Sequence, residues 1–250
     1  MKKKVLIAGN WKMHKTIEET ESFICQLAPE ITACDVLVYL AVPFTALKSA
    51  AKAAEGSKII VGAQNMHSEP SGAFTGEISA LMLKEAGAEF VLIGHSERRT
   101  LFKETDAEVH KKLLRALKDD LQPLLCLGET AQERADGETE TVLKGQLEKA
   151  LKGLSFDLLE KLVIAYEPVW AIGTGQVATP EMAEEVHHFL RKELTGLFGK
   201  AASGKIYLLY GGSVKPDNVL ALMQKPNIDG ALIGGASLEV DSFLKIIQSF

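Results

Sequence analysis

The sequence predicts a (β/α)8 barrel, a parallel eight-stranded closed sheet surrounded by helices. Short apolar runs typical of buried parallel strands alternate with helical patterns along the whole chain. Each strand–helix unit is about 30 residues long, and 250 residues hold about eight of them. Neither a linker nor a low-complexity segment divides the units, so we expect residues 1–250 to form one domain. An open doubly wound sheet is the competing arrangement.

The apolar runs mark the strands. Strict alternation with helices implies parallel strands with right-handed crossovers. The run from Val163 ends in a carboxylate, Glu167, and Pro168 then ends the strand because proline cannot donate to a sheet ladder. The expected strands are residues 5–9, 36–42, 58–63, 90–94, 123–127, 163–167, 206–210 and 230–233.

Capping residues mark the helices between these strands. Thr16 and Glu19 form a capping box, and we expect that helix to stop before Pro29. Thr179 and Pro180 supply a cap and a first-turn proline for a later helix. The expected helices are residues 16–28, 45–55, 78–86, 105–118, 138–152 and 181–197, a short helix from residue 216, and residues 238–248.

Composition narrows the function class. The net charge is −5 with acidic and basic residues mixed, so the chain has no basic stripe suited to nucleic acid and no basic amphipathic helix suited to a membrane surface. No apolar run is long enough for a membrane span or a signal peptide. The chain has three cysteines, Cys25, Cys34 and Cys126, and an odd number argues against a disulfide framework. This favours a reduced, cytoplasmic protein, although the spacing alone permits a Cys25–Cys34 bridge.

Unusual polar residues lie at the ends of the expected strands. The carboxyl ends of barrel strands carry the chemistry of this fold, so these residues are candidate site residues. Glu167 precedes a segment rich in Gly and Ala, which suits a general base beneath a lid; an ion-paired edge Glu beside an ordinary loop is the alternative. The candidates at strand ends are Asn10, Lys12, His95, Glu97, Glu167 and Ser213.

Two glycine turns come directly after the last two expected strands. Gly211-Gly212-Ser213 and Gly234-Gly235 can bring main-chain amides close to an anion at a helix start. The corresponding barrel loops often bind phosphate, although glycine can also serve two tight turns. The Gly173-Thr174-Gly175 segment is no dinucleotide fingerprint, because residues 168–172 separate it from its strand.

The remaining candidates carry less weight. No metal site is expected, since the adjacent His187 and His188 diverge on a helix and no HxH or HExxH occurs. Cys126 fits a small packed residue better than a nucleophile. His95 precedes a short helix, whose N-terminus disfavours imidazolium. Proton abstraction beside a carbonyl needs the groups that these residues supply together. They are a base, a neutral imidazole donor, the cation Lys12 with Glu97 as its partner, and a phosphate cradle.

Five motifs resemble those of the triosephosphate isomerase family, in the same order over nearly the whole chain. They are Asn10-Trp11-Lys12-Met13, Gly94-His95-Ser96-Glu97-Arg98-Arg99, the stretch from Ala165 to Gly175, Tyr210-Gly211-Gly212-Ser213-Val214 and Gly234-Gly235-Ala236-Ser237-Leu238.

The resemblance implies interconversion of dihydroxyacetone phosphate and glyceraldehyde 3-phosphate in glycolysis and gluconeogenesis, without a cofactor. It implies Glu167 as the proton shuttle, His95 as donor to the enediolate and Lys12 as the stabilising cation, with Glu97, Ser96 and Cys126 in support. The substrate-binding residues implied are Asn10, Lys12, Gly173, Ser213, Gly234 and Gly235. The lid implied comprises Pro168, Val169, Trp170, Ala171, Ile172, Gly173, Thr174, Gly175, Gln176, Val177 and Ala178.

A long loop at residues 64–77 is the expected partner contact. A loop of this length in a compact domain is usually functional, and we expect Met66 and Phe74 to be exposed at its ends. The resemblance implies a homodimer in which Phe74 and Thr75 enter the partner, with Thr75 near the partner's active-site lysine.

Two alternatives remain open on the sequence. Another cofactor-free sugar-phosphate isomerase or aldolase would use the same fold, and an aldolase would need Lys12 as a Schiff-base lysine. A phosphate-binding scaffold without catalysis is the second alternative, against which the presence of both His95 and Glu167 argues.

Overall fold

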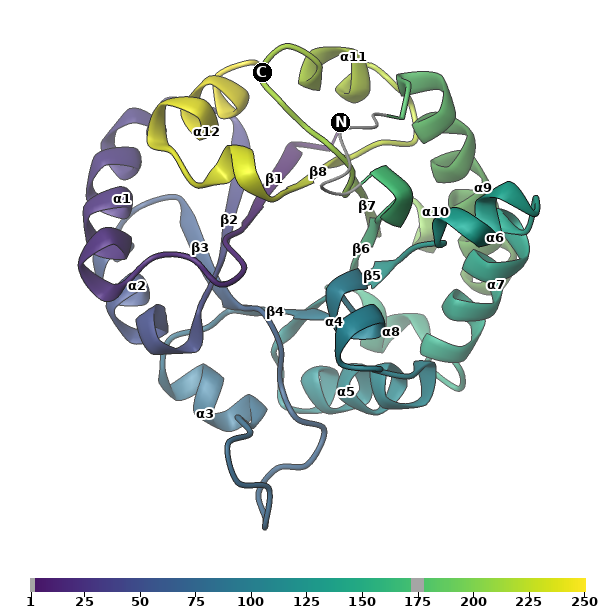
Figure 1. The fold of residues 1–250 in the computed structure, drawn as a ribbon, viewed down its shortest axis with the longest axis horizontal. Helices are drawn as coiled ribbons and strands as arrows, with labels where there is room; N and C mark the ends of the chain where they lie inside the picture. The colour runs from purple at the N-terminus through teal and green to yellow at the C-terminus, as the bar shows by residue number, and fades with distance from the viewer. Residues whose placement is uncertain (1–2, 172–177) are drawn as a thin grey trace.

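The computed structural model describes residues 3–171 and 178–250, and within them eight parallel strands close into a barrel (Figure 1). Each strand pairs with the next along the chain, and β1 closes the sheet on β8, with Leu6 opposite Gly230. The competing open sheet is therefore excluded. The strands are β1 Val5–Asn10, β2 Val36–Val42, β3 Ile59–Ala63, β4 Phe90–Ile93, β5 Gln122–Leu127, β6 Val163–Tyr166, β7 Tyr207–Tyr210 and β8 Gly230–Ile233.

Helices surround the barrel, and the longer ones lie where capping and periodicity predict them (Figure 1). They are α1 Ile17–Glu30, α2 Leu47–Ala53, α3 Ala80–Glu85, α4 Ser96–Leu101, α5 Asp106–Lys118, α6 Ala131–Ala135, α7 Thr139–Ala150, α8 Phe156–Leu159, α9 Pro180–Phe198, α10 Lys200–Ser203, α11 Val219–Met223 and α12 Val240–Ile247. Three 3-10 turns complete the described elements: η1 Phe44–Ala46, η2 Val169–Ala171 and η3 Gly235–Ser237.

Three details of these helices differ from the sequence-based expectation. Pro29 lies inside the last turn of α1 rather than beyond it, and residue 216 precedes α11 without starting it. The short helices α6, α8 and α10 were not expected, because four or five residues are too few for a hydrophobic periodicity to be recognised.

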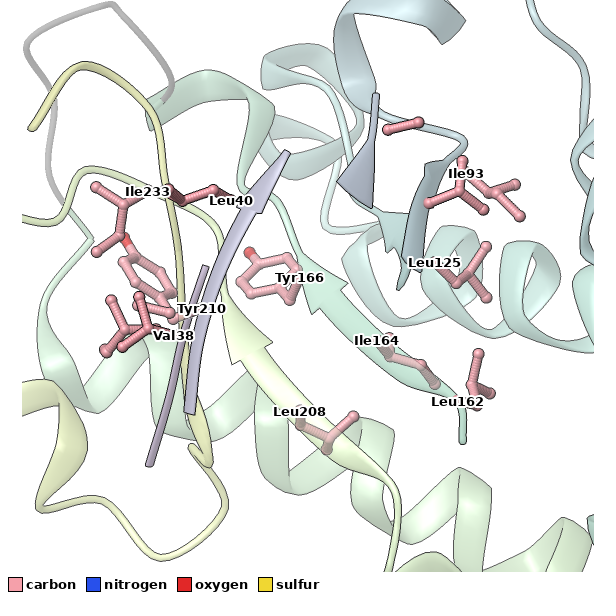
Figure 2. Close-up of a cluster of buried hydrophobic side chains, with 14 of the residues drawn as sticks. Val38, Leu40, Ile93, Leu125, Leu162, Ile164, Tyr166, Leu208, Tyr210 and Ile233 are labelled. Carbon is pink, nitrogen blue, oxygen red and sulfur yellow. The ribbon is translucent and has the colours of Figure 1, made fainter. Parts of the chain in front are cut away.

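The core has two layers, because successive side chains of each strand point to opposite faces of the sheet. Residues such as Leu6, Ala8, Val163 and Ala165 fill the barrel interior. The alternate residues pack outward against the helices. Figure 2 shows part of this outer layer, which includes Val38, Leu40, Ile93, Leu125, Leu162, Ile164, Tyr166, Leu208, Tyr210 and Ile233.

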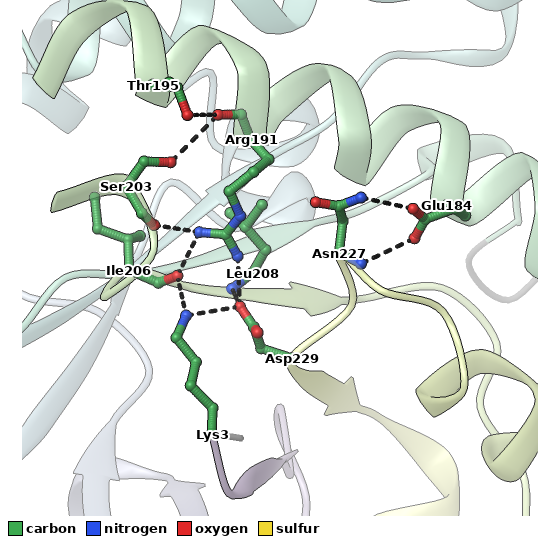
Figure 3. Close-up of polar contacts among 9 residues, drawn as sticks. All are labelled: Lys3, Glu184, Arg191, Thr195, Ser203, Ile206, Leu208, Asn227 and Asp229. Carbon is green, nitrogen blue, oxygen red and sulfur yellow. Dashed lines mark hydrogen bonds and ion pairs between the residues drawn. The ribbon is translucent and has the colours of Figure 1, made fainter. Parts of the chain in front are cut away.

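A partly buried polar network joins β1, β7, β8 and α9 at the end of the barrel opposite the site residues (Figure 3). One oxygen of Asp229 accepts from Arg191 Nη2 at 2.6 Å, from Lys3 Nζ at 3.1 Å and from the Leu208 N–H at 2.9 Å. Arg191 and Lys3 also donate to the Ile206 carbonyl. A single carboxylate therefore connects the strands at which the barrel closes.

The long loop between β3 and α3 projects away from the barrel (Figure 1). Phe74 is 44% exposed, as expected, and its ring lies 4.2 Å from that of His67. The expectation that Met66 is exposed is wrong: its side chain is fully buried in the outer core layer. Met66 therefore anchors the base of the loop, whereas residues 69–77 are exposed.

The cysteines are all free, so the Cys25–Cys34 bridge is not formed. None of the helices in the described ranges combines the length and apolar character needed to cross a bilayer.

Candidate active site

A cavity of about 380 Å³ opens at the carboxyl ends of the strands. Its wall brings together eight of the residues singled out from the sequence, namely Asn10, Lys12, His95, Glu97, Glu167, Ser213, Gly234 and Gly235. The same wall contains the predicted lid residue Ala171 and the turn residues Gly211 and Gly212. It also contains residues that the sequence analysis did not name as site residues, among them Val214, Lys215, Leu232 and Ala236. Residues from five of the strand ends thus share one cavity.

Glu167 follows β6 and faces the barrel interior, because it alternates in step with Val163 and Ala165. Its side chain is 2% exposed. One carboxylate oxygen accepts from His95 Nε2 at 2.9 Å and from Ser96 Oγ at 3.2 Å, and the other accepts from the Ser96 N–H at 2.9 Å. Burial raises the pKa of Glu167, but His95 and Ser96 together outweigh this effect, so the net direction is downward. The carboxylate is therefore held in its charged, proton-accepting form.

His95 reaches the cavity because the chain turns at Gly94, which has a φ of 73°. It then caps the N-terminus of α4, where Nδ1 accepts the Glu97 N–H at 3.2 Å. A nitrogen that accepts a main-chain N–H carries no proton, so the ring proton lies on Nε2.

Opposing effects act on the pKa of His95. Burial lowers it, and the adjacent Glu167 carboxylate raises it, with a net upward direction while the two side chains touch. The Glu97 N–H opposes a second ring proton as long as Nδ1 accepts it, since Nδ1 cannot donate to a donor. In this arrangement His95 presents its Nε2 proton to the cavity, whereas contact with Glu167 shifts the pKa of the ring against the neutral form predicted from the sequence.

Lys12 has a φ of 53°, an uncommon conformation for a residue with a side chain. Its N–H donates to Asn10 Oδ1 at 3.0 Å, which stabilises this turn after β1. Its ammonium lies 2.5 Å from Glu97 Oε1, so the predicted pairing is confirmed. This ion pair fixes a positive charge on the cavity wall.

The glycine turns after β7 and β8 line the cavity between Glu167, which follows β6, and Lys12, which follows β1. A side chain at Gly211 would meet the Glu167 side chain at 3.0 Å, so glycine is needed here for close packing beside the carboxylate. Among the described residues, nothing accepts from the main-chain N–H groups of Ser213, Gly234 and Gly235. These groups are available to an anion.

Only the two ends of the predicted lid belong to the described chain. Val169 to Ala171 form η2, and Trp170 Nε1 donates to Glu129 Oε1 at 2.9 Å. Ala178 is buried, and Thr179 caps α9. The predicted lid residues outside the described ranges are Ile172, Gly173, Thr174, Gly175, Gln176 and Val177.

Cys126 and Ser96, two of the predicted supporting residues, both interact with Glu167. Ser96 donates to it from its N–H and its hydroxyl, and Cys126 is fully buried in the barrel interior. Burial raises the pKa of the Cys126 thiol well above its usual range, and Glu167 raises it further. Cys126 is thus a packed thiol and not a nucleophile. No group of three His, Cys, Asp or Glu side chains in the described ranges could hold a metal ion.

Two contributors near the site were not predicted from the sequence. Glu129 is fully buried after β5 and accepts from Tyr166 Oη at 3.0 Å, from Trp170 and from Arg134. Its place after a strand was the same signal that identified Glu167. Lys215 lines the cavity two residues beyond Ser213, and its nearness to the glycine turn was the available signal.

Comparison with known proteins adds independent findings. A family model described as Triosephosphate isomerase matches residues 5–250. The triosephosphate isomerase of Alkaliphilus metalliredigens is 51% identical over 246 residues, covering 98% of this chain and 99% of the relative. That of Moorella thermoacetica is 50% identical over 243 residues (97% of each chain), and that of Protochlamydia amoebophila is 48% identical over 244 residues (98% and 92%).

Proposed function

The chain belongs to the triosephosphate isomerase family, and we propose that Glu167, His95 and Lys12 carry out its isomerisation within one barrel domain formed by residues 1–250. The chain is an aldose–ketose isomerase, an intramolecular oxidoreductase that interconverts dihydroxyacetone phosphate and D-glyceraldehyde 3-phosphate in glycolysis and gluconeogenesis. One observation carries the assignment of roles: a carboxylate, an Nε2–H donor and an ammonium line one cavity together with the glycine turns after β7 and β8.

The proposed reaction begins when Glu167 exchanges its contact with His95 for the substrate carbon next to the carbonyl. Glu167 takes a proton from that carbon, and the bonding electrons move to the carbonyl oxygen to form an enediolate. His95 Nε2–H donates to the enediolate oxygens and Lys12 stabilises their charge. The proton of the substrate hydroxyl moves to the former carbonyl oxygen, and Glu167 returns its own proton to the neighbouring carbon. The hydroxyl carbon thereby becomes the new carbonyl, and no metal or organic cofactor takes part.

Substrate binding is proposed for Asn10 and Lys12 on one side and for the amides of Gly173, Ser213, Gly234 and Gly235 around the phosphate. The available N–H groups of the last three support this assignment. The lid from Pro168 to Ala178 is proposed to exclude water, which protects the enediolate phosphate from losing phosphate before reprotonation.

The Lys12–Glu97 ion pair favours a charged ammonium at Lys12, whereas a Schiff base forms on a neutral amine. This argues against an aldolase.

We also propose a homodimer formed through the loop of residues 64–77, with Phe74 and Thr75 inserted into the partner. Most of the large exposed apolar side chains in the described ranges belong to the first four strand–helix units, which are neighbours in the barrel. They are Met13, Ile17, Phe44, Phe74, Leu81, Met82, Leu101 and Phe102. An apolar surface on one side of the barrel supports a partner there.

The free cysteines support a reducing, cytoplasmic location.

A coupled assay with dihydroxyacetone phosphate and glyceraldehyde 3-phosphate tests the function in both directions. In D2O the product should carry deuterium at the carbon that receives the proton, because a carboxylic acid exchanges its proton with solvent. Deuterium at that carbon would exclude direct hydride transfer between the carbons, and a wild type that fails to turn over either triose phosphate would overturn the proposed function.

A further inference from the structure

Gln146 makes an unusual pair of hydrogen bonds. Its side chain extends from α7 to the chain just beyond β5, where its Nε2 donates to the Gly128 carbonyl at 3.0 Å and its Oε1 accepts the Gly128 N–H at 2.9 Å. One amide side chain therefore satisfies both main-chain polar groups of a residue that lies past the end of its strand. This is the pairing that a neighbouring strand would otherwise supply.

Gly128 lies directly against the backbone that carries Glu167. The Leu127 carbonyl accepts the Glu167 N–H at 2.7 Å, and the Glu129 carbonyl accepts the Val169 N–H at 3.2 Å. A side chain on Gly128 would lie 1.9 Å from the Glu167 carbonyl oxygen. Residues 127–129 thus form a platform for the Glu167 segment, and Gln146 holds the centre of that platform.

The same platform holds the first part of the lid. The buried Glu129 side chain accepts from Tyr166 Oη and from Trp170 Nε1, which flank Glu167 and Pro168 along the chain. The Gly128 N–H belongs to the same peptide group as the Leu127 carbonyl, so a rotation of that group would move the acceptor of the Glu167 N–H. The two hydrogen bonds of Gln146 oppose that rotation from outside the barrel.

We propose that Gln146 is a positioning residue for the reaction: its bidentate contact with Gly128 fixes the platform that aligns the Glu167 carboxylate with the substrate carbon. Gln146 does not line the cavity, and it acts through Gly128. The inference rests on the proposed role of Glu167 as the base.

Gln146→Met tests the proposal, because methionine keeps the length of the side chain and removes both hydrogen bonds. We expect kcat to fall roughly tenfold with KM changed by less than about twofold, since a displacement well below 1 Å is enough to slow proton abstraction. The kinetic isotope effect on kcat with substrate deuterated at the reacting carbon should rise, because abstraction becomes more rate-limiting. Gln26→Met, at an exposed glutamine on α1, is the matched control and should leave all three unchanged.

Gln146→Glu supplies a second signature. An ionised carboxylate keeps the acceptor for the Gly128 N–H but sets an oxygen against the Gly128 carbonyl, whereas a protonated carboxyl restores the donor. The ratio of its kcat to that of the wild type should therefore rise as pH falls from 8 to 5.5, while the ratio for Gln146→Met stays flat.

The outcomes separate the role of Gln146 from simple stability and from the proposed function. An unchanged kcat in Gln146→Met would overturn the proposal. So would a lower kcat with an unchanged isotope effect, because that pattern reports a smaller folded fraction and not a displaced base. If the wild type itself failed to turn over triose phosphates, the proposed function would fail independently of Gln146.

Discussion

Glu167 combines two features that rarely occur together, near-complete burial and a lowered pKa. Burial alone would favour the protonated acid. The His95 Nε2–H and the two Ser96 donors reverse this, so the carboxylate enters the reaction charged. The same donors must release it before it can reach a substrate carbon. The position of each carboxylate oxygen is therefore the quantity to which the rate should be most sensitive.

Glu167→Asp keeps the charge and withdraws the carboxylate by the length of one methylene. We expect kcat to fall on the order of 100-fold with KM nearly unchanged, because the shorter acid cannot reach the substrate carbon without distortion. Steady-state kinetics in both directions measure the change. A variant with wild-type turnover would show that another group is the base.

At the scale of elements, α9 docks on the sheet through His187. The ring is fully buried and lies 5.7 Å from the ring of Tyr166 on β6 and 6.3 Å from that of Tyr210 on β7. Its Nδ1–H donates to the Ala183 carbonyl, and its Nε2 has no hydrogen-bond partner among the described residues. Burial lowers the pKa of His187, although neighbouring carbonyls and carboxylates partly oppose the effect.

This histidine makes folding stability depend on pH. The unfolded chain binds a proton near the ordinary value of 6.5, and the folded chain does so only at lower pH, so stability falls as pH drops below 6.5. For one proton the loss reaches at most about 1.4 kcal/mol per pH unit. His187→Gln should weaken this dependence in denaturant unfolding between pH 7.5 and 5.5. The exposed neighbour variant His188→Gln should retain it; identical pH slopes in both variants would contradict the prediction.

At the scale of the whole molecule, the charge distribution opposes an anionic substrate. The net charge is −5, and within the cavity Lys12 is paired with Glu97. Lys215 is exposed on the cavity wall, and its ammonium forms no ion pair with a described residue. The local positive field near the phosphate cradle should therefore depend on Lys215.

Lys215→Gln should lower kcat/KM about three- to tenfold at low ionic strength and leave kcat nearly unchanged, because only the encounter is affected. The difference from the wild type should disappear as salt is added. Lys52→Gln, at an exposed lysine on α2, is the control. A deficit that persists at high salt would indicate direct binding and not steering.

Assembly is the other property of the whole molecule. Thr75→Arg places a charge at the tip of the projecting loop and should convert the proposed dimer into monomers, with lower activity because the loop is proposed to approach the partner's site. Sedimentation at several concentrations measures the change. Leu158→Asp, at an exposed leucine on α8, should leave assembly intact. A wild-type protein that sediments as a monomer at every concentration would refute the dimer.

Local patterns along the chain were enough to predict the eight strands, the longer helices and the polar residues at the strand ends, because strand alternation, caps and proline stops act within a few residues. The short helices α6, α8 and α10 carried no such signal. Parallel strands then required those polar residues to meet at one end of the barrel. Packing in three dimensions settled that Met66 is buried, that Glu167 rests on His95, and that Gln146 holds Gly128. Gln146 and Gly128 are 18 positions apart, and His95 and Glu167 are 72 positions apart. Such contacts, like the burial of Met66, depend on how the strand–helix units pack, and patterns within a few residues do not predict them.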